Sequence, residues 1–557
     1  MSTTTASTVP ASGGAPGPQD AARHASGRLI EFFSDSTTPW ARRLWDIGSV
    51  LALEELWEAG SWQAAGVLSG SACDWQRNQL SARIGPDRGL GDKQLRRQIT
   101  DVLKAPLPDP SPGRRTLRQL IDHARPDYLT RWAQAAADAP ATIKPERFAR
   151  ALASHLLDLG FSSAYLQQEA FGLYNRRLDL AGIAQACAEI AARPERTFEV
   201  LVTLDKVPHR DIAATLDTWR DKGQVSAWLK SNGHKGLRSG GGFVYACRAR
   251  DPHGAADQAR RIVERLIARA AFLRKHRDGV VPHDQVWVQD HPDPITWAPP
   301  ARGANLTSLT TENHLYRVDG PPSRLDDALE LAAPINLGAL GPAVAGAWAA
   351  VESLLCHPDD PQNENERSGK AIAADRFAMI VACSWPRAEL TALAYRHSPT
   401  TPDALAEVLE TCTSNAARSR VVAEALAVSG PQALALGKSR IPQGDPAAAL
   451  RMTNMLANPG VVLRDVADTL KLTMRRLYRA RNIVLHGGST QGVALDAALR
   501  TAAPILGAGL DRMVHAALVE QLDPLDLAAR AEVALQLVGG DTGLTPVDLL
   551  EAANARS

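Results

Sequence analysis

Three polar residues near the end of a predicted helix combine the side chains that phosphodiester cleavage requires. The stretch LYRARNIVLHGG, residues 477–488, contains Arg481, Asn482 and His486. Histidine titrates near neutral pH and moves a proton, whereas arginine stabilises the charge that develops on a five-coordinate phosphorus. When the adjacent 2′-hydroxyl of RNA is the nucleophile, no metal ion is required and DNA is excluded by chemistry. These residues therefore indicate a metal-independent ribonuclease site.

The residues around this group predict the helix that positions it. At about 100° per residue, the segment 470–486 has an apolar face made of Leu470, Met474, Leu477, Val484 and Leu485. A neighbouring polar face is made of Lys471, Arg475, Arg479, Asn482 and His486. Gly487 and Gly488 then end the helix, so His486 lies in its last turn, where the helix dipole favours the charged imidazole.

Arg481 departs from this pattern, because it projects near the centre of the apolar face. A guanidinium that faces a protein core costs free energy unless it is paired and hydrogen-bonded. Two explanations are open. Either the helix is distorted at Arg481, or this face meets a group that binds a guanidinium.

Four further cations precede the group, namely Lys471, Arg475, Arg476 and Arg479. One interpretation is an RNA-binding track of cations that leads into the site, with an affinity for RNA that falls steeply with salt. The other is a helix face that is simply exposed to solvent, as most charge runs on helices are. The sequence alone does not separate the two.

The segment RNIVLH resembles the R-(N/D/H)-x3-H motif of HEPN-domain ribonucleases. The longer LYRARNIVLHGG is similar to the form LYxLRNxIVHGG found in HEPN domains of the ApeA type, from bacterial anti-phage systems. The segment AGAWAAVESLL, residues 345–355, resembles the helix that opens such domains, and GKAIAADRFAMIV, residues 369–381, resembles the helix that follows. The resemblance covers residues 330–520, which is about a third of the chain.

This resemblance implies an endoribonuclease that leaves a 2′,3′-cyclic phosphate and a 5′-hydroxyl. Arg481 and His486 match the catalytic pair, and Asn482 matches the polar residue between them. Glu352 matches the acidic residue of ESLL and is expected to pair with Arg481 across the bundle. Ala480 stands where the family more often has leucine, which is a difference in packing. Because such nucleases build one site from two facing motifs, a homodimer is also expected.

The biological role implied by the resemblance is phage defence by abortive infection, or a toxin-like arrest of translation. The expected partners are RNA, such as tRNA or another cellular RNA, and a phage-derived trigger or a partner subunit. Two alternatives stay open. One is a non-catalytic HEPN module that binds RNA or dimerises and senses phage with a partner protein. The other is the accessory of a nucleotidyltransferase, although the chain carries no GS…DxD pattern.

An arginine followed by a histidine five positions later is weak evidence without its context. The same spacing recurs at Arg118/His123, Arg150/His155 and Arg248/His253. The first two pairs lie on ordinary charged helices, and the third lies where a predicted strand ends. Only Arg481 and His486 have the inserted Asn482, the preceding aromatic and basic residues and the two glycines.

Composition sets further bounds. The net charge of +1 gives no global reason to bind nucleic acid. Six scattered cysteines without a CxxC pattern argue against a structural zinc site and a disulfide framework, so a reduced, cytoplasmic setting and no cofactor are expected. The N-terminus lacks the features of a signal peptide. The nearly uncharged segment Leu337–Leu355 contains Pro342 and Glu352 and is expected to be a buried helix rather than a membrane span.

The pattern along the chain predicts a mainly α protein with an α+β part. We expect a disordered tail at 1–25, a helical domain at 26–190, a small α+β domain at 191–325 and the HEPN-like helical bundle at 326–557. Within the α+β domain, strands are expected at 196–205, 240–249 and 284–290, with a helix at 254–275. Residues 26–325 are expected to sense a signal, regulate the site or select the substrate.

Overall fold

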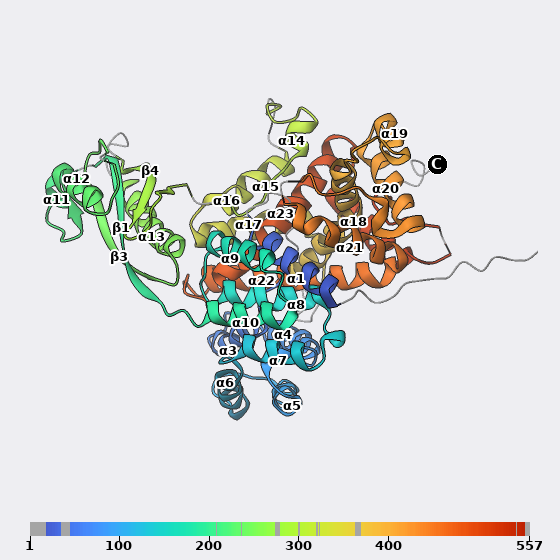
Figure 1. Cartoon of the computed structure of the whole chain (residues 1–557), viewed down its shortest axis with the longest axis horizontal. Helices are drawn as coiled ribbons and strands as arrows, with labels where there is room; N and C mark the ends of the chain where they lie inside the picture. The colour runs from blue at the N-terminus through green and yellow to red at the C-terminus, as the bar shows by residue number, and fades with distance from the viewer. Residues whose placement is uncertain are drawn as a thin grey trace, which may run out of the picture.

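The computed structural model describes most of the chain: residues 18–34, 45–207, 209–235, 237–272, 279–298, 301–318, 321, 323–361, 369–439, 441–541 and 543–551. These residues are mainly helical and contain one five-stranded sheet, as the sequence predicts (Figure 1). The elements form an N-terminal helical unit, an α+β unit that projects to one side, and a C-terminal helical unit.

The N-terminal unit is entirely helical over the residues described. Its helices are α1 (Pro18–Phe33), α3 (Ser49–Ala64), α4 (Gly70–Ile84), α5 (Lys93–Val102), α6 (Pro112–Ala124), α7 (Tyr128–Asp138), α8 (Pro145–Asp158), α9 (Ser163–Asn175) and α10 (Leu180–Ala191). They enclose a core of their own, to which α1 contributes Leu29, Ile30 and Phe33.

The expected disordered tail over residues 1–25 is wrong from Pro18 onward, because α1 begins there. Residues 1–17 lie outside the described part of the chain. Ala21, Ala22 and Ala25 are buried, and their small side chains let α1 pack closely against α8 and α9. The alanines at the end of the predicted tail are therefore part of a close contact between helices.

The α+β unit holds the predicted strands and helix. Its strands are β1 (Arg196–Lys206), β2 (Trp219–Arg220), β3 (Gly242–Ala249), β4 (Val281–Val288) and β5 (Ile295–Thr296), in the order β2-β3-β1-β4-β5 with every neighbour antiparallel. Its helices are α11 (Arg210–Ala213), α12 (Lys222–Ser231) and α13 (Pro252–Ala270). The apolar side of α13 covers one face of the sheet, and α12 covers the other.

The C-terminal unit is a bundle around one large core. Its helices are α14 (Ser308–Thr311), α15 (Arg324–Ala332), α16 (Pro334–Leu337), α17 (Leu340–Leu355), α18 (Gly369–Arg396), α19 (Ala404–Thr411), α20 (Asn415–Ser429), α21 (Asp445–Ala457), α22 (Pro459–Leu485), α23 (Leu495–Leu518) and α24 (Pro524–Leu537). The indole of Trp348 is fully buried on α17, which confirms the buried helix predicted there. No helix among the described residues is long and apolar enough to cross a membrane.

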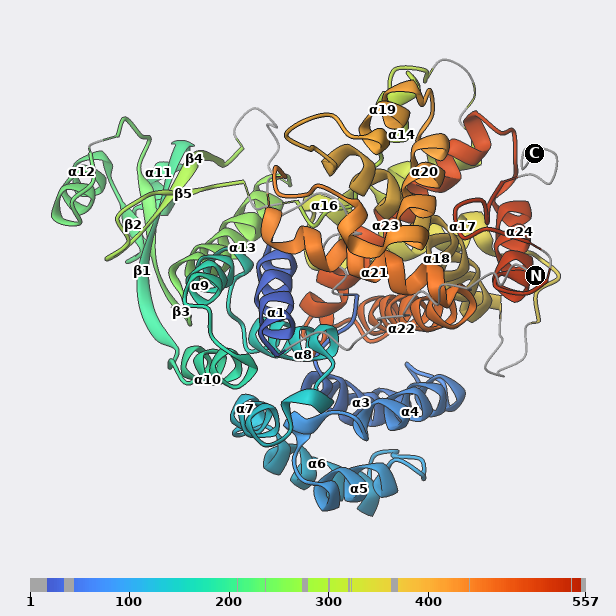
Figure 2. The same cartoon turned by 45° about the vertical axis from the view of Figure 1, so that its right-hand side comes forward.

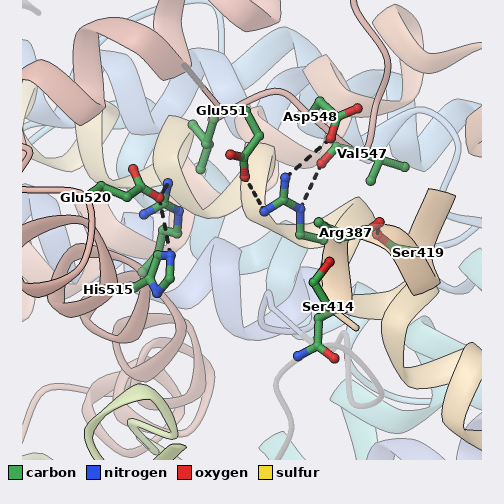
Figure 3. Close-up of polar contacts among 12 residues, drawn as sticks. Arg387, Ser414, Ser419, His515, Glu520, Val547, Asp548 and Glu551 are labelled. Carbon is green, nitrogen blue, oxygen red and sulfur yellow. Dashed lines mark hydrogen bonds and ion pairs between the residues drawn. The ribbon is translucent and has the colours of Figure 1, made fainter. Parts of the chain in front are cut away.

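Ion pairs attach the last described segment to the bundle (Figure 3). Arg387 of α18 donates to the carbonyl of Val547 at 3.0 Å, and its guanidinium also pairs with Asp548 and Glu551. Beside this cluster, Glu520 contacts His515. Burial alone would raise the pKa of Glu520, but His515 and a neighbouring arginine lower it to about 2. The contacts of Arg387 attach the last described segment to α18.

Buried ion pairs join α22 to the N-terminal unit. Glu55 of α3 accepts from Arg476 at 3.0 Å and from Arg479 at 2.8 Å, and Arg476 also pairs with Asp46 at 2.9 Å. Burial would raise the pKa of Glu55, but the two guanidiniums outweigh it and lower the pKa below its ordinary value of 4.5. Figure 2 shows α3 and α4 beside α22, where these contacts hold them.

We predict that Glu55→Gln lowers the free energy of unfolding at pH 7 by about 3 kcal/mol, because it leaves two buried guanidiniums without their shared carboxylate. Since the folded-state pKa of Glu55 is lowered, its stabilisation is complete above pH 4.5 and is lost as the pH falls through the folded-state value. Urea unfolding at several pH values measures the difference. The exposed Glu410→Gln on α19 is the control. A difference that is the same at pH 7 and pH 3 would contradict the assignment.

Candidate active site at the end of α22

The end of α22 is built as its sequence predicts. His486 follows the last helical residue, and its amide donates to the carbonyl of Asn482 at 2.8 Å. Gly488 has a φ of +63°, the left-handed conformation that glycine adopts at a helix end. At Gly487 a Cβ atom would lie 2.9 Å from the Trp62 ring of α3, so the glycine permits a close approach of the N-terminal unit.

Arg481, Asn482 and His486, hereafter the terminal polar group, form one hydrogen-bonded unit. The Nη1 atom of Arg481 donates to Asn482 Oδ1 at 3.0 Å and lies 3.1 Å from His486 Nε2. A guanidinium carries only donors, so this contact is a hydrogen bond when Nε2 acts as the acceptor. His486 is exposed, whereas Asn482 is buried. The group therefore presents an imidazole and a guanidinium side by side at one point of the surface.

Glu352 lies beside Arg481, as expected from the resemblance. Its Oε2 atom is 4.0 Å from Arg481 Nη2 and accepts from the buried Trp348 Nε1 at 3.0 Å, while Oε1 pairs with Lys370 Nζ at 3.1 Å. The shorter contacts are thus to Trp348 and Lys370. Glu352 connects α17 to α18 and leaves Arg481 only loosely paired.

Arg481 does not face the core as the helical projection predicts. Its side chain is 16% exposed and lines a cleft. Leu485, assigned to the apolar face, is 51% exposed, whereas Leu470 and Leu477 are fully buried. Val484 in the last turn of α22 still packs against the bundle core, whereas Arg481 lines the cleft, so Arg481 lies at the margin of the core rather than inside it.

The predicted RNA-binding track is not an exposed surface, which corrects the expectation for Arg475, Arg476 and Arg479. All three are buried. Arg475 makes two hydrogen bonds to Asp375, at 2.9 and 2.6 Å, and the other two are held by the carboxylates of the N-terminal unit. Lys471 is 3.5 Å from Asp468 on its own helix. These cations chiefly neutralise internal carboxylates.

A cleft of about 620 Å³ opens at the terminal polar group. One wall is formed by that group together with Lys370, Tyr478 and the inner cations Arg475 and Arg479. The other wall comes from the N-terminal unit: residues 66–72, which contain the start of α4, and Trp75. Clefts of this size typically accommodate small ligands or a short stretch of polymer.

Part of this cleft could not be predicted from the sequence. Lys370 follows a polar loop, and Ser69 and Trp75 lie some four hundred positions before the motif. A serine before a helix is a common cap, so nothing distinguishes Ser69 until α4 is seen beside α22. Trp75 is already covered on one side by the Arg475 guanidinium, 4.1 Å from its ring centre.

The other arginine–histidine pairs of the same spacing have structural roles. Arg118 pairs with Asp122 on α6 at 3.1 Å. His155 is buried and stacks on Tyr128 with ring centres 4.3 Å apart, and its burial lowers its pKa to about 4. Arg248 pairs with Glu195 at 3.2 Å. Each pair therefore has an ordinary packing or surface explanation.

Comparison with known proteins adds nothing to these observations: no protein-family model, curated protein or solved structure matches the chain. In the described ranges, no cluster of three or more His, Cys, Asp or Glu side chains is arranged to hold a metal ion. The terminal polar group and its cleft are therefore the features from which a function can be proposed.

We predict that Glu352→Gln and Glu352→Ala differ in stability. The glutamine keeps an acceptor for Trp348 Nε1 and loses only the part-exposed ion pairs, which costs less than about 1 kcal/mol. The alanine also leaves a buried indole N–H unpaired, which lowers the free energy of unfolding by a further amount of about 1–3 kcal/mol. Denaturant unfolding of the two variants and the wild type provides the measurement. Equal losses for both would show that Trp348 does not depend on Glu352.

Proposed function

We propose that the chain is a metal-independent endoribonuclease of the HEPN type, with Arg481, Asn482 and His486 as its catalytic group. The observation that carries this proposal is the joining of the three side chains by hydrogen bonds at the mouth of a 620 Å³ cleft. The cleft also contains Lys370, whose side chain is 43% exposed and suited to a phosphate.

The proposed reaction follows from the roles of these side chains. His486 Nε2 accepts the proton of the RNA 2′-hydroxyl, and the 2′-oxygen attacks the adjacent phosphorus. The bond from phosphorus to the 5′-oxygen of the next nucleotide breaks. This oxygen takes a proton from a solvent water molecule, and His486 returns the proton that it accepted to the solvent. The products are a 2′,3′-cyclic phosphate and a 5′-hydroxyl. Arg481 leaves Nε2 when the phosphate enters and stabilises its developing charge, while Asn482 Oδ1 orients the guanidinium.

The size of the cleft favours RNA that is locally single-stranded. A volume of about 620 Å³ accommodates one or two nucleotides, whereas an RNA duplex is far wider. The ring of Tyr478, packed 4.8 Å from Trp348, supplies an aromatic surface within the cleft. Bases that are splayed out of a helix commonly stack on such surfaces.

The proposed cellular role is phage defence by abortive infection, with RNA as the substrate and a phage-derived trigger or partner subunit. A homodimer through the C-terminal unit remains part of this proposal. Because α3 and α4 occupy one side of the terminal polar group, a second copy would approach it from another side.

One observation favours the alternative of a non-catalytic HEPN module. Nε2 of His486, the atom required as the base, is already engaged by Arg481 at 3.1 Å. If RNA does not displace this contact, the cleft binds RNA without cleaving it. Such a module would serve as a phage sensor together with a partner protein.

We predict that the protein cleaves total cellular RNA in EDTA and that His486→Ala and Arg481→Ala each reduce the rate about 10²–10⁴-fold. Gel electrophoresis of the RNA measures the rate, and circular dichroism verifies that each variant is folded. Arg118→Ala and His123→Ala, which have the same spacing on α6, are the matched controls and should keep the wild-type rate.

Two outcomes would contradict this proposal. Loss of wild-type cleavage on addition of EDTA would exclude a metal-independent mechanism. Retention of cleavage in folded His486→Ala would place the catalytic base elsewhere. RNA binding without turnover, also in lysate from phage-infected cells, would favour the non-catalytic module.

A further inference from the structure

The start of α4 lines the cleft and has backbone amides without an intrahelical partner. Ser69 caps the helix, and its side chain accepts from the amide of Ala72 at 3.2 Å. The amides of Gly70 and Ser71 therefore remain without an intrahelical partner, as at every helix start. All of these residues line the cleft. The positive end of the helix dipole adds to their attraction for an anion.

The opposite wall of the cleft contains a buried cation, which would also attract an anion bound at the start of α4. Arg479 is 4% exposed and lines the cleft, and its Nη2 atom is held by Glu55. Its Nε atom has no hydrogen-bond partner within the described part of the chain. The guanidinium is close enough to α4 to act on Cys73: burial raises the pKa of that thiol to about 11, and Arg479 works against the rise. The residues that carry the unpaired buried donor and the unpaired amides thus line the same cleft.

We propose that the first turn of α4 and Arg479 form a binding subsite for a phosphodiester of single-stranded RNA. This inference rests on the proposed function, because it places a second phosphate of the same strand beside the one that faces His486. The cleft, about 620 Å³ in volume, contains both positions and no room for a duplex. Ser69 makes no contact with the reacting atoms and acts by positioning the strand.

The proposed site is built from two parts of the same chain. Both walls of the cleft come from one chain, the motif from α22 and the phosphate subsite from α4. The N-terminal unit therefore selects and holds the substrate strand in addition to covering α22. Binding of RNA at this subsite requires no contribution from a second copy.

The test uses a substitution that preserves the helix cap and adds a negative charge at the start of α4, where the phosphate is proposed to bind. Aspartate caps helices as well as serine does, and an acidic residue at a helix start is favourable, so Ser69→Asp keeps α4 folded. Ser414→Asp is the matched control, since Ser414 caps α20 and accepts from Ala417 at 3.1 Å, away from α4 in both views (Figures 1 and 2). Ser71→Asp provides a second variant of the subsite if Ser69→Asp fails to fold.

The probe is a fluorescent, single-stranded 2′-O-methyl RNA, which the proposed reaction does not cleave because its 2′-oxygen is blocked. We expect Ser69→Asp to raise the dissociation constant roughly tenfold at low salt and Ser414→Asp to leave it within about twofold. The difference should narrow as salt is added, because screening weakens the repulsion. Equal dissociation constants for the two folded variants would overturn the subsite.

This binding readout separates the two proposals. A wild-type protein that binds the probe through Ser69 and never cleaves unmodified RNA would refute the nuclease and leave the subsite standing. Cleavage that depends on His486 with a KM unaffected by Ser69→Asp would refute the subsite and leave the nuclease standing.

Discussion

The buried ion pairs of Glu55 with Arg476 and Arg479, two of the arginines of α22, are the constraint on which the arrangement of the site depends. Arg476 and Arg479 lie on the helix that carries the terminal polar group, and both are buried. A buried guanidinium requires a carboxylate, and the N-terminal unit supplies it from α3. The ion pairs therefore hold α3 and α4 against α22, and the cleft exists because they do.

The arginines near the C-terminal end of α22 differ in how strongly they are paired with carboxylates. Arg475, Arg476 and Arg479 are held by carboxylates of neighbouring helices, whereas Arg481 has only a 4.0 Å contact to Glu352 and hydrogen bonds within the terminal polar group. An arginine that is loosely paired at the edge of a cleft can move to a phosphate without breaking a strong ion pair. The first three position the helix, Arg479 also lines the cleft, and Arg481 is the arginine to which we assign the proposed catalytic role.

The sequence predicted what is local and missed what depends on distant residues. The end of α22 at Gly487 and Gly488, the main strands and the contact between Glu352 and Arg481 follow from periodicity, turn residues and resemblance. The burial of the arginines could not be predicted from the sequence, because their partners lie as far away as position 46. A helical projection shows which residues share a face, but it does not show which other helix covers that face. Strands β2 and β5 are two residues each, too short for any alternation to show.

The wall formed by α4 could not be predicted for the same reason, since only the fold brings Ser69 to the motif.

The most direct test of the proposed nuclease is the chemistry of the cleaved ends. RNA and its all-deoxy counterpart are incubated with the protein in EDTA, and the products are analysed by mass spectrometry. We expect fragments ending in 2′,3′-cyclic phosphate and 5′-hydroxyl from RNA and none from DNA. Fragments with 3′-hydroxyl and 5′-phosphate ends, or cleavage of the DNA, would contradict it.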